Sequence, residues 1–295
     1  MNDVNKSFGF LTMATPSDYL KAIGLAISLK VSNPGVPIAV ACSKKLHPLL
    51  QPYFDYLVEE KAGLRGFVHK VYLDEYSPFE DTVFFDSDVL VFKEVKPYVY
   101  SWGDAAYCAC GIYFKDGLSA FGLNRAEILK KINKSQMVEI GGAGHAFFRK
   151  PGCKQIFDMA RDITANYKEI AGDIAYADED VLNIVMTKLD IVPAPHYDFF
   201  ARYLSAKNGT MKMDASNATC SFIYRDTGKP YHPCMVHFAA NEAPFAYSWQ
   251  IYKLFKKFNV PTTGLLKMCL SDAYELYIKL RISFYLRKFK NRIKN

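Results

Sequence analysis

The sequence lacks the cysteine patterns that mark disulfide scaffolds and zinc sites. Its seven cysteines are an odd number without a C-x-x-C pair, and Cys108 and Cys110 form only a C-x-C inside an apolar stretch. The N-terminus has no basic segment leading into an apolar run, and no apolar run reaches the length that spans a bilayer. These absences predict a cytoplasmic protein in a reducing compartment.

Net positive charge is almost absent over most of the chain and is concentrated at its end. The 295 residues carry a net charge of +7, and residues 265–295 hold eight basic and two acidic side chains. The remainder is therefore close to neutral, which argues against a nucleic-acid-binding surface over the body of the protein. Half of the residues are apolar, enough to bury a substantial core.

Strands that alternate with helices predict a mostly parallel, Rossmann-like sheet in the N-terminal part. An apolar run over 8–14 precedes a helical pattern over 19–30, and a second strand over 36–42 precedes an expected helix over 46–58. A further buried strand is predicted over 83–85. This order is typical of an α/β fold with helices on both faces, in which ligands bind at the carboxyl ends of the strands.

The second half of the chain continues this pattern. A glycine-rich break over 141–144 precedes predicted helices over 152–168 and 181–186. The sequence contains no internal repeat and no low-complexity linker. We expect one α/β domain over 1–245 and a helical, basic C-terminal extension over 246–295.

An acidic step follows the predicted strand 83–85. Asp86 and Asp88 are two residues apart, so both carboxylates point the same way from extended backbone. Paired carboxylates at a sheet edge suit a hard divalent cation, Mn²⁺ or Mg²⁺, that shares its coordination with phosphate oxygens. The D-x-D pattern is typical of nucleotide-sugar glycosyltransferases, although an acidic turn after a strand also occurs without a metal.

Four separated segments resemble, in order, those of the family 8 retaining glycosyltransferases, such as glycogenin and bacterial lipooligosaccharide galactosyltransferases. They are the opening segment 11–19, Lys70 sixteen residues before Asp86, and the segments 178–183 and 237–245, which are similar to D-Q-x-x-L-N and H-F-x-G-x-x-K-P-W. The resemblance implies a GT-A fold and a hexosyltransferase that uses a UDP-sugar donor, a divalent cation and a glycan or lipid-linked acceptor.

The resemblance also implies which residues form the site. Asp86, Asp88 and His237 would bind the metal ion, and Glu179 or Asp178 would act as nucleophile, ion-pair stabiliser or general base. The donor would contact Met13, Thr15, Tyr19, Lys70, Ser87, Gly142, Ala143 and Gly144. The glycine-rich segment would let the backbone approach the donor sugar, with His145 facing the acceptor.

The sequence departs from the family 8 pattern at four positions. Glu179 stands in place of Gln, Ala240 in place of Gly, Ala243 in place of Lys and Phe245 in place of Trp. The missing lysine is a charge that the family uses on the diphosphate. The G-G-A-G run over 141–144 also resembles the inverting family 31 enzymes, so retention and inversion both stay open.

Each candidate has an alternative structural interpretation. His237 fits a core histidine, Lys70 a solvated strand end, Tyr19 a packing residue, and residues 178–180 an acidic helix N-terminus. For the whole protein, the alternatives are a non-catalytic nucleotide-sugar-binding protein and a nucleic-acid-binding protein.

The end of the chain predicts an amphipathic helix. Apolar residues recur at helical spacing at Leu266, Leu270, Tyr274, Tyr277, Ile278, Phe284 and Tyr285, and basic residues crowd the C-terminal half of 265–295. This combination predicts peripheral binding to an anionic membrane, on its cytoplasmic face. The alternative is that the apolar face packs on the catalytic domain.

Overall fold

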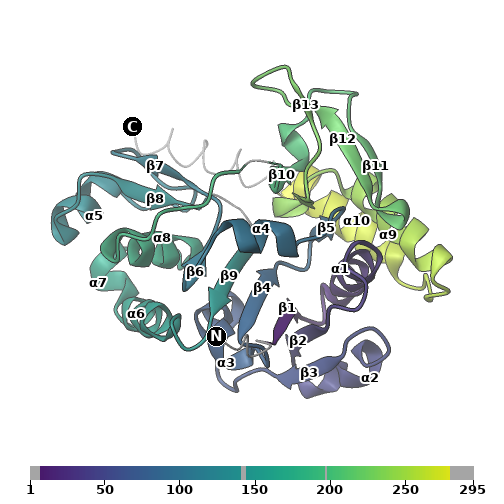
Figure 1. Ribbon diagram of the computed structural model, residues 1–295, viewed down its shortest axis with the longest axis horizontal. Coiled ribbons are helices and arrows are strands. Elements are labelled where there is room, and N and C mark those ends of the chain that lie inside the picture. The colour runs from purple at the N-terminus through teal and green to yellow at the C-terminus, as the bar shows by residue number, and fades with distance from the viewer. Residues whose placement is uncertain (1–6, 141–143, 197, 280–295) are drawn as a thin grey trace, which may run out of the picture.

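A six-stranded sheet forms the centre of the molecule. The computed structural model describes residues 7–140, 144–196 and 198–279 (Figure 1). The strand order is β3-β2-β1-β4-β9-β6; the first four strands run parallel, and β9 runs antiparallel to both β4 and β6. The bounds are β1 (Phe8–Ala14), β2 (Ile38–Cys42), β3 (Tyr56–Glu59), β4 (Asp81–Phe85), β6 (Tyr107–Cys108) and β9 (His145–Arg149). The predicted mostly parallel α/β sheet is confirmed.

Three smaller sheets complete the β structure. One pairs β5 (Val89–Val91), β14 (Met235–His237) and β10 (Phe200–Arg202), and a second pairs β11 (Lys212–Asp214), β12 (Thr219–Ile223) and β13 (Pro230–Tyr231). The third is an antiparallel pair of β7 (Ile112–Phe114) and β8 (Met137–Glu139), with α5 between them in the sequence. The pairing of β14 with β5 places the end of β14 beside the turn that follows β4.

Helices cover both faces of the central sheet (Figure 1). One side carries α1 (Tyr19–Ser32), α9 (Pro244–Lys257) and α10 (Leu265–Tyr274). The other side carries α3 (Leu73–Tyr76), α5 (Arg125–Ile132), α6 (Lys154–Ala165), α7 (Tyr167–Ala171) and α8 (Asp178–Lys188). Short helical segments are η1 (Lys44–Leu46), α2 (His47–Leu50), η2 (Gly66–Tyr72), α4 (Lys96–Ser101), η3 (Tyr203–Ser205), η4 (Ala215–Asn217), η5 (Ala239–Asn241) and η6 (Glu275–Lys279).

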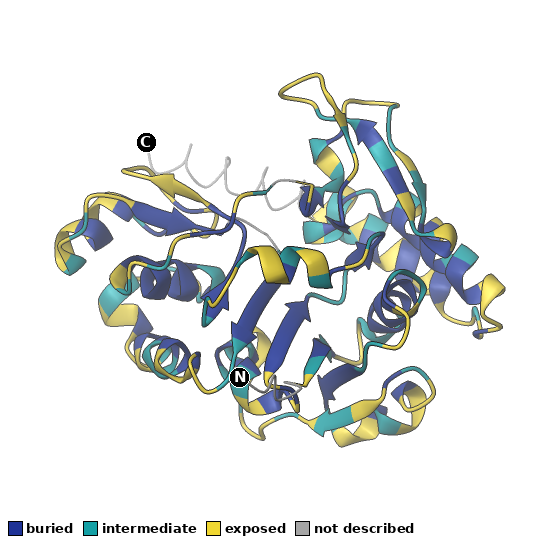
Figure 2. Ribbon diagram, viewed as in Figure 1, coloured by how far each residue is buried: buried dark blue, intermediate teal, exposed yellow. Residues whose placement is uncertain are grey.

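Two hydrophobic cores lie on opposite faces of the sheet because successive strand residues point in opposite directions. Phe10 and Val83 belong to the core under α1 and α9, whereas Leu11 and Phe84 belong to the core under α6 and α8. Strands covered on both faces need apolar residues at nearly every position, which explains their continuous apolar runs. Figure 2 shows the central strands β1, β4 and β9 as buried along most of their length.

The helix predicted over 46–58 is wrong. The chain forms only the short helix α2 and then enters the edge strand β3, which pairs Leu57 with Val40 of β2. Pro52 has no backbone N–H and cannot continue the helical hydrogen bonds. The residues after it, Tyr56 to Val58, favour a pleated strand.

The C-terminal helices pack against the body of the protein. Ile251 of α9 lies against Gly24 of α1, so closely that a Cβ at Gly24 would come within 2.1 Å of the Ile251 Cδ1 atom. The boundary expected after residue 245 falls inside α9, and the division into two units stays a prediction. None of the helices in the described ranges is long and apolar enough to cross a membrane.

One face of α10 and η6 remains exposed. Leu265 and Met268 are buried, but the residues predicted to form an apolar face, Leu266, Leu270, Tyr274, Tyr277 and Ile278, are 45–73% exposed. These five side chains are therefore not buried against the domain, although the Tyr277 ring stacks on Phe245 of α9. Phe284 and Tyr285 lie outside the described residues.

Candidate active site

A cleft of about 430 Å³ lies at the carboxyl end of β4. The turn after β4 forms one wall, the N-terminus of α8 forms another, and the segment after β14 closes a third. The cleft brings together eight of the residues that the sequence predicts for the site, which are Lys70, Asp86, Asp88, Gly144, His145, Asp178, Glu179 and His237.

Three of these residues form a compact group of ligand atoms. His237 Nε2 lies 3.0 Å from Asp88 Oδ1 and 3.9 Å from Asp86 Oδ2. One ligand atom from each of the three residues lies within 4.8 Å of the others. Two carboxylates and one imidazole form a donor set that suits Mn²⁺, so these residues fit a divalent cation.

The backbone fixes the approach of His237 to the two carboxylates. β14 runs antiparallel to β5 and pairs His237 with Val89, and the backbone N–H of Phe238 donates to the carbonyl of Asp88 at 3.1 Å. The His237 side chain is buried, but it faces carboxylates rather than an apolar core. The alternative of a histidine that only fills the core is not supported.

The electrostatic environment keeps Asp88 ionised. Burial alone would raise the pKa of Asp88, but the charge and hydrogen bond of His237 and the charges of Lys21 and Lys70 lower this pKa to about 2. An ionised carboxylate is the form that binds a metal ion.

Lys70 lies between two carboxylates in the cleft. Its Nζ atom is 2.8 Å from Asp86 Oδ1 and 3.2 Å from Asp178 Oδ2. Burial alone would lower the pKa of Lys70, but the charges of Asp178 and Asp86 raise it above its ordinary value, so the amine stays protonated at neutral pH. Lys70 is therefore a cation fixed inside the cleft rather than a solvated strand end.

The acidic side chains in the first turn of α8 lie in two different environments. Asp178 and Glu179 line the cleft. Asp180 is fully buried and accepts a hydrogen bond from the Tyr167 hydroxyl at 3.2 Å, and burial raises the pKa of Asp180. Asn183 accepts a hydrogen bond from the Ile140 N–H at 2.9 Å. Asp180 and Asn183 thus hold α8 in place, which leaves Asp178 and Glu179 as candidates for chemistry.

Gly144 lies next to two of the candidate metal ligands, Asp86 and His237. Its carbonyl accepts a hydrogen bond from the Asp86 N–H at 2.8 Å, and its φ of +62° is left-handed. A Cβ on Gly144 would lie 2.7 Å from His237 Nδ1. We therefore expect Gly144→Ala to displace the imidazole and weaken Mn²⁺ binding at least about tenfold, as measured by calorimetry.

A matched control for this variant is Gly172→Ala. Gly172 has a φ of +84° and a ψ of −164°, which L-residues rarely adopt, and nothing lies within 4 Å of an added Cβ, so the change introduces backbone strain without a contact to a metal ligand. Both variants should lose some stability. Equal Mn²⁺ affinities in the two variants would contradict the assignment of His237 as a ligand.

The residues predicted to bind the nucleoside lie beside the cleft but do not line it. Among the described residues, Met13, Thr15 and Tyr19 do not line the cleft. Tyr19 packs against the hydrophobic core under α1 and α9. Asp18 connects this region to the site, because its carboxylate accepts hydrogen bonds from Thr15 and, at 3.3 Å, from the Ser87 hydroxyl. Their contact with a nucleoside stays a prediction.

Two predicted donor contacts, Gly142 and Ala143, lie outside the described residues. His145, which was expected to face the acceptor, is 4% exposed and its Nε2 atom accepts a hydrogen bond from the Cys110 N–H at 3.3 Å. The chain that follows β6 therefore holds the His145 side chain in the wall of the cleft. Contact with an acceptor stays a prediction.

Sequence reasoning missed several residues that line the cleft. Phe67 and Phe121 are 54% and 42% exposed, and Glu139 forms a buried ion pair with Arg125 at 2.9 Å. Arg202 also lines the cleft. Glu139 and Arg202 stand out in the sequence as charges inside apolar segments, whereas the exposure of Phe67 and Phe121 is known only from the structure.

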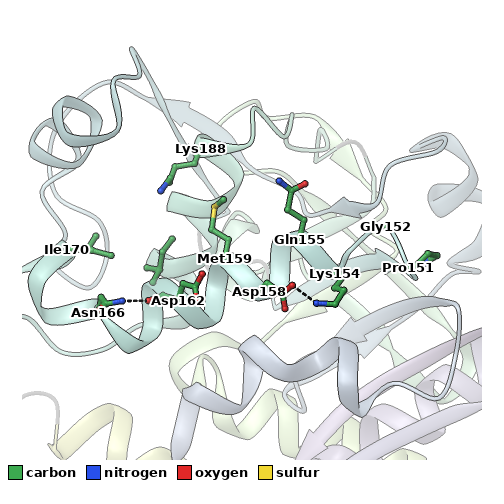
Figure 3. Close-up of a pocket in the computed structure, with 11 residues that line it drawn as sticks. Pro151, Gly152, Lys154, Gln155, Asp158, Met159, Asp162, Asn166, Ile170 and Lys188 are labelled. Atoms are coloured by element: carbon green, nitrogen blue, oxygen red, sulfur yellow. Dashed lines mark hydrogen bonds and ion pairs between the residues drawn. The ribbon is translucent and has the colours of Figure 1, made fainter.

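A larger hollow lies elsewhere, along α6 (Figure 3). It measures about 710 Å³, but it is an open surface depression in which Lys154 and Asp158 pair at 2.6 Å and Asn166 donates to the Asp162 carbonyl. It holds none of the predicted site residues. Size therefore does not identify the site in this protein; the convergence of charged groups does.

Comparison with known proteins places the chain in a fold class. No protein-family model matches the sequence, and no curated protein matches it. Solved structures of glycosyltransferases match over most of the chain, and this similarity, together with the mixed sheet, shows a GT-A glycosyltransferase fold.

Two of these structures set the scale of the similarity. The galactosyltransferase LgtC, solved with donor and acceptor sugar analogues, has 16% identity and a TM-score of 0.54, covering 87% of this chain and 98% of its own. The bifunctional glycosyltransferase WbbM has 12% identity and a TM-score of 0.55, covering 91% of this chain. The chain spans about half (52%) of that WbbM chain. The resemblance to the family of LgtC agrees with the sequence motifs.

Proposed function

We propose that this protein is a metal-dependent hexosyltransferase that moves a sugar from a UDP-sugar to a glycan or lipid-linked glycan acceptor. The observation that carries this proposal is the convergence of Asp86, Asp88 and His237 with a protonated Lys70 in one cleft of a GT-A fold. The solved LgtC complex, with its donor and acceptor sugar analogues, supports a two-substrate site in this kind of fold.

The residues of the cleft have complementary tasks in this proposal. A divalent cation bound there would act as a Lewis acid toward the diphosphate leaving group. Asp86, Asp88 and His237 hold that position, and Lys70 directs a fixed positive charge at the phosphates. Asp178 and Glu179 offer a carboxylate to the anomeric carbon or to the acceptor hydroxyl.

The proposal is tested by incubating the purified protein with Mn²⁺ and a panel of nucleotide sugars. Slow hydrolysis that releases UDP from one sugar, and that stops in EDTA, is the expected result. Tight binding of a nucleotide sugar without any turnover would instead support the alternative of a non-catalytic binding protein. Full activity in EDTA would contradict the metal dependence.

We expect transfer with retention of anomeric configuration. The segments 11–19 and 237–245 and the position of Lys70 support it, since all three resemble the retaining family 8. NMR of the anomeric proton of the product measures the outcome directly. An inverted linkage would favour the alternative, an inverting GT-A enzyme in which Asp178 or Glu179 is the general base.

The exposed face of α10 and η6 supports a peripheral, cytoplasmic association with an anionic membrane. This face continues onto α9, where Phe245 and Trp249 are 59% and 58% exposed, and the Phe245 ring stacks on Tyr277 at 6.5 Å. Exposed aromatic and aliphatic side chains next to a basic chain end are typical of interfacial binding. Each basic residue near the surface would contribute about 1 kcal/mol before screening.

We therefore expect the full chain to float with vesicles that contain anionic lipid. A chain ending at Ser283, and a Leu266→Glu/Leu270→Glu variant, should both float less, and added salt should reduce the binding of the full chain. The Leu49→Glu variant is a control, because Leu49 is also about half exposed but lies on α2. Binding that is absent, or insensitive to truncation and salt, would remove the membrane assignment.

A further inference from the structure

A strained turn forms part of the wall of the cleft. The turn follows β14 and covers Ala239–Ala243, and Ala239 and Ala240 line the cleft. Three of its residues are left-handed without being glycine: Ala240 at φ +52°, Asn241 at φ +59° and Ala243 at φ +48°. Such a conformation costs about 1 kcal/mol or more per residue and persists only where neighbouring groups impose it.

Lys21 is one of the groups that impose this conformation. It comes from α1, where it is the only charged side chain on the buried face, and its Nζ atom donates to Asn241 Oδ1 at 2.8 Å. The same Nζ atom pairs with Asp272 of α10 at 2.9 Å, and both side chains are about nine-tenths buried. The amide of Asn241 donates in turn to Glu275 at 3.1 Å.

Glu242 anchors the other side of the turn. Its carboxylate pairs with Arg202 and accepts a hydrogen bond from the Leu204 N–H at 3.2 Å. The turn is thus held at two consecutive residues by charged side chains from other elements. Lys21, Asp272 and Glu242 are buried, and buried charges are costly unless they are paired, so these contacts constrain the shape of the turn.

We propose that Lys21 is a positioning residue for the diphosphate of the donor. It fixes the Ala239–Ala243 turn, which lines the cleft next to His237, through its hydrogen bond to Asn241 and its ion pair with Asp272. The inference rests on the proposed function. The wall of the cleft then depends on α1 and α10, which hold the turn through Lys21 and Asp272.

The metal ligands do not depend on this network. His237 is fixed by the pairing of β14 with β5, and Phe238 bonds to Asp88 through the backbone. Loss of Lys21 should therefore weaken nucleotide binding while it leaves the binding of Mn²⁺ alone unchanged. A role in folding only would reduce the fraction of competent protein and leave the affinity of that fraction unchanged.

Calorimetric titration of the full chain with UDP in the presence of Mn²⁺ separates these outcomes. The variant is Lys21→Met/Asp272→Asn, which removes both charges together and leaves no unpaired ion in the interior. We expect about a tenfold weaker UDP affinity at unchanged stoichiometry. Lys21→Arg, which keeps the charge, should bind UDP more tightly than the double variant.

The control is Lys257→Met. Lys257 also joins two elements, because it donates to the Ser216 carbonyl at 2.6 Å and to Asn217, but it lies at the opposite end of α9 from the turn. Wild-type UDP affinity in the double variant, or a lower stoichiometry alone, would overturn the role of Lys21 and leave the proposed function intact. Failure of the wild-type protein to bind any nucleoside diphosphate would overturn both.

Discussion

Replacement of Asp88 by asparagine is expected to lower turnover by about 100-fold or more. The variant is isosteric and keeps an oxygen near His237 Nε2, so the fold should survive. It removes the negative charge that a divalent cation requires, in a residue whose low pKa keeps it ionised at neutral pH. UDP release in Mn²⁺ measures the effect, and Asp86→Asn and His237→Ala should show the same loss.

Asp104→Asn is the matched control for the Asp88 variant. Asp104 is also paired with a basic side chain, Arg149 at 3.5 Å, but its carboxylate is fully exposed and outside the cleft. Its activity should equal that of the wild type. Full activity in Asp88→Asn would refute the metal assignment.

Replacement of Lys70 by methionine is expected to cost about 100-fold in turnover. The change removes the cation between Asp86 and Asp178 and leaves two carboxylates facing each other across the cleft. Their mutual repulsion would disturb the group that binds the metal. Steady-state kinetics with saturating Mn²⁺ measures the loss.

Lys61→Met provides the comparison for Lys70. Lys61 also pairs with a carboxylate, Glu75 at 2.5 Å, and lies over the Tyr72 ring, but its side chain is 42% exposed and does not line the cleft. Exposed pairs of this kind contribute little, so turnover should stay at the wild-type level. Similar losses in both variants would show that Lys70 acts only through stability.

Local sequence patterns were sufficient to predict the central part of the fold. The strand at 8–14, the helix that begins at Tyr19 and the acidic step after β4 follow from apolar runs and from the direction of successive side chains. The helix predicted over 46–58 is wrong because Pro52 ends the helical hydrogen bonds after α2. Pairing of a strand at the sheet edge with β2 is a tertiary effect that periodicity does not contain.

Only those parts of the candidate site that lie in short sequence motifs could be predicted. Asp86 and Asp88 lie in one turn, and His237 was found through the resemblance of its segment rather than from periodicity. The contact between Lys21 and Asn241 joins residues 220 positions apart, and no local pattern specifies it. The only sequence signal for this contact is the position of Lys21 within the apolar face of a helix. A buried lysine needs a partner, but the sequence does not show which residue that partner is.

The most direct test of the central claim is a crystal structure of the protein with Mn²⁺ and UDP, using anomalous scattering to locate the manganese. We expect an anomalous peak about 2.0–2.3 Å from Asp86, Asp88 and His237, with diphosphate oxygens completing the coordination. The peak should lie in the cleft that contains Lys70 and Asp178. A manganese peak bound elsewhere, or a cleft without metal and nucleotide at saturating concentrations of both, would contradict the account.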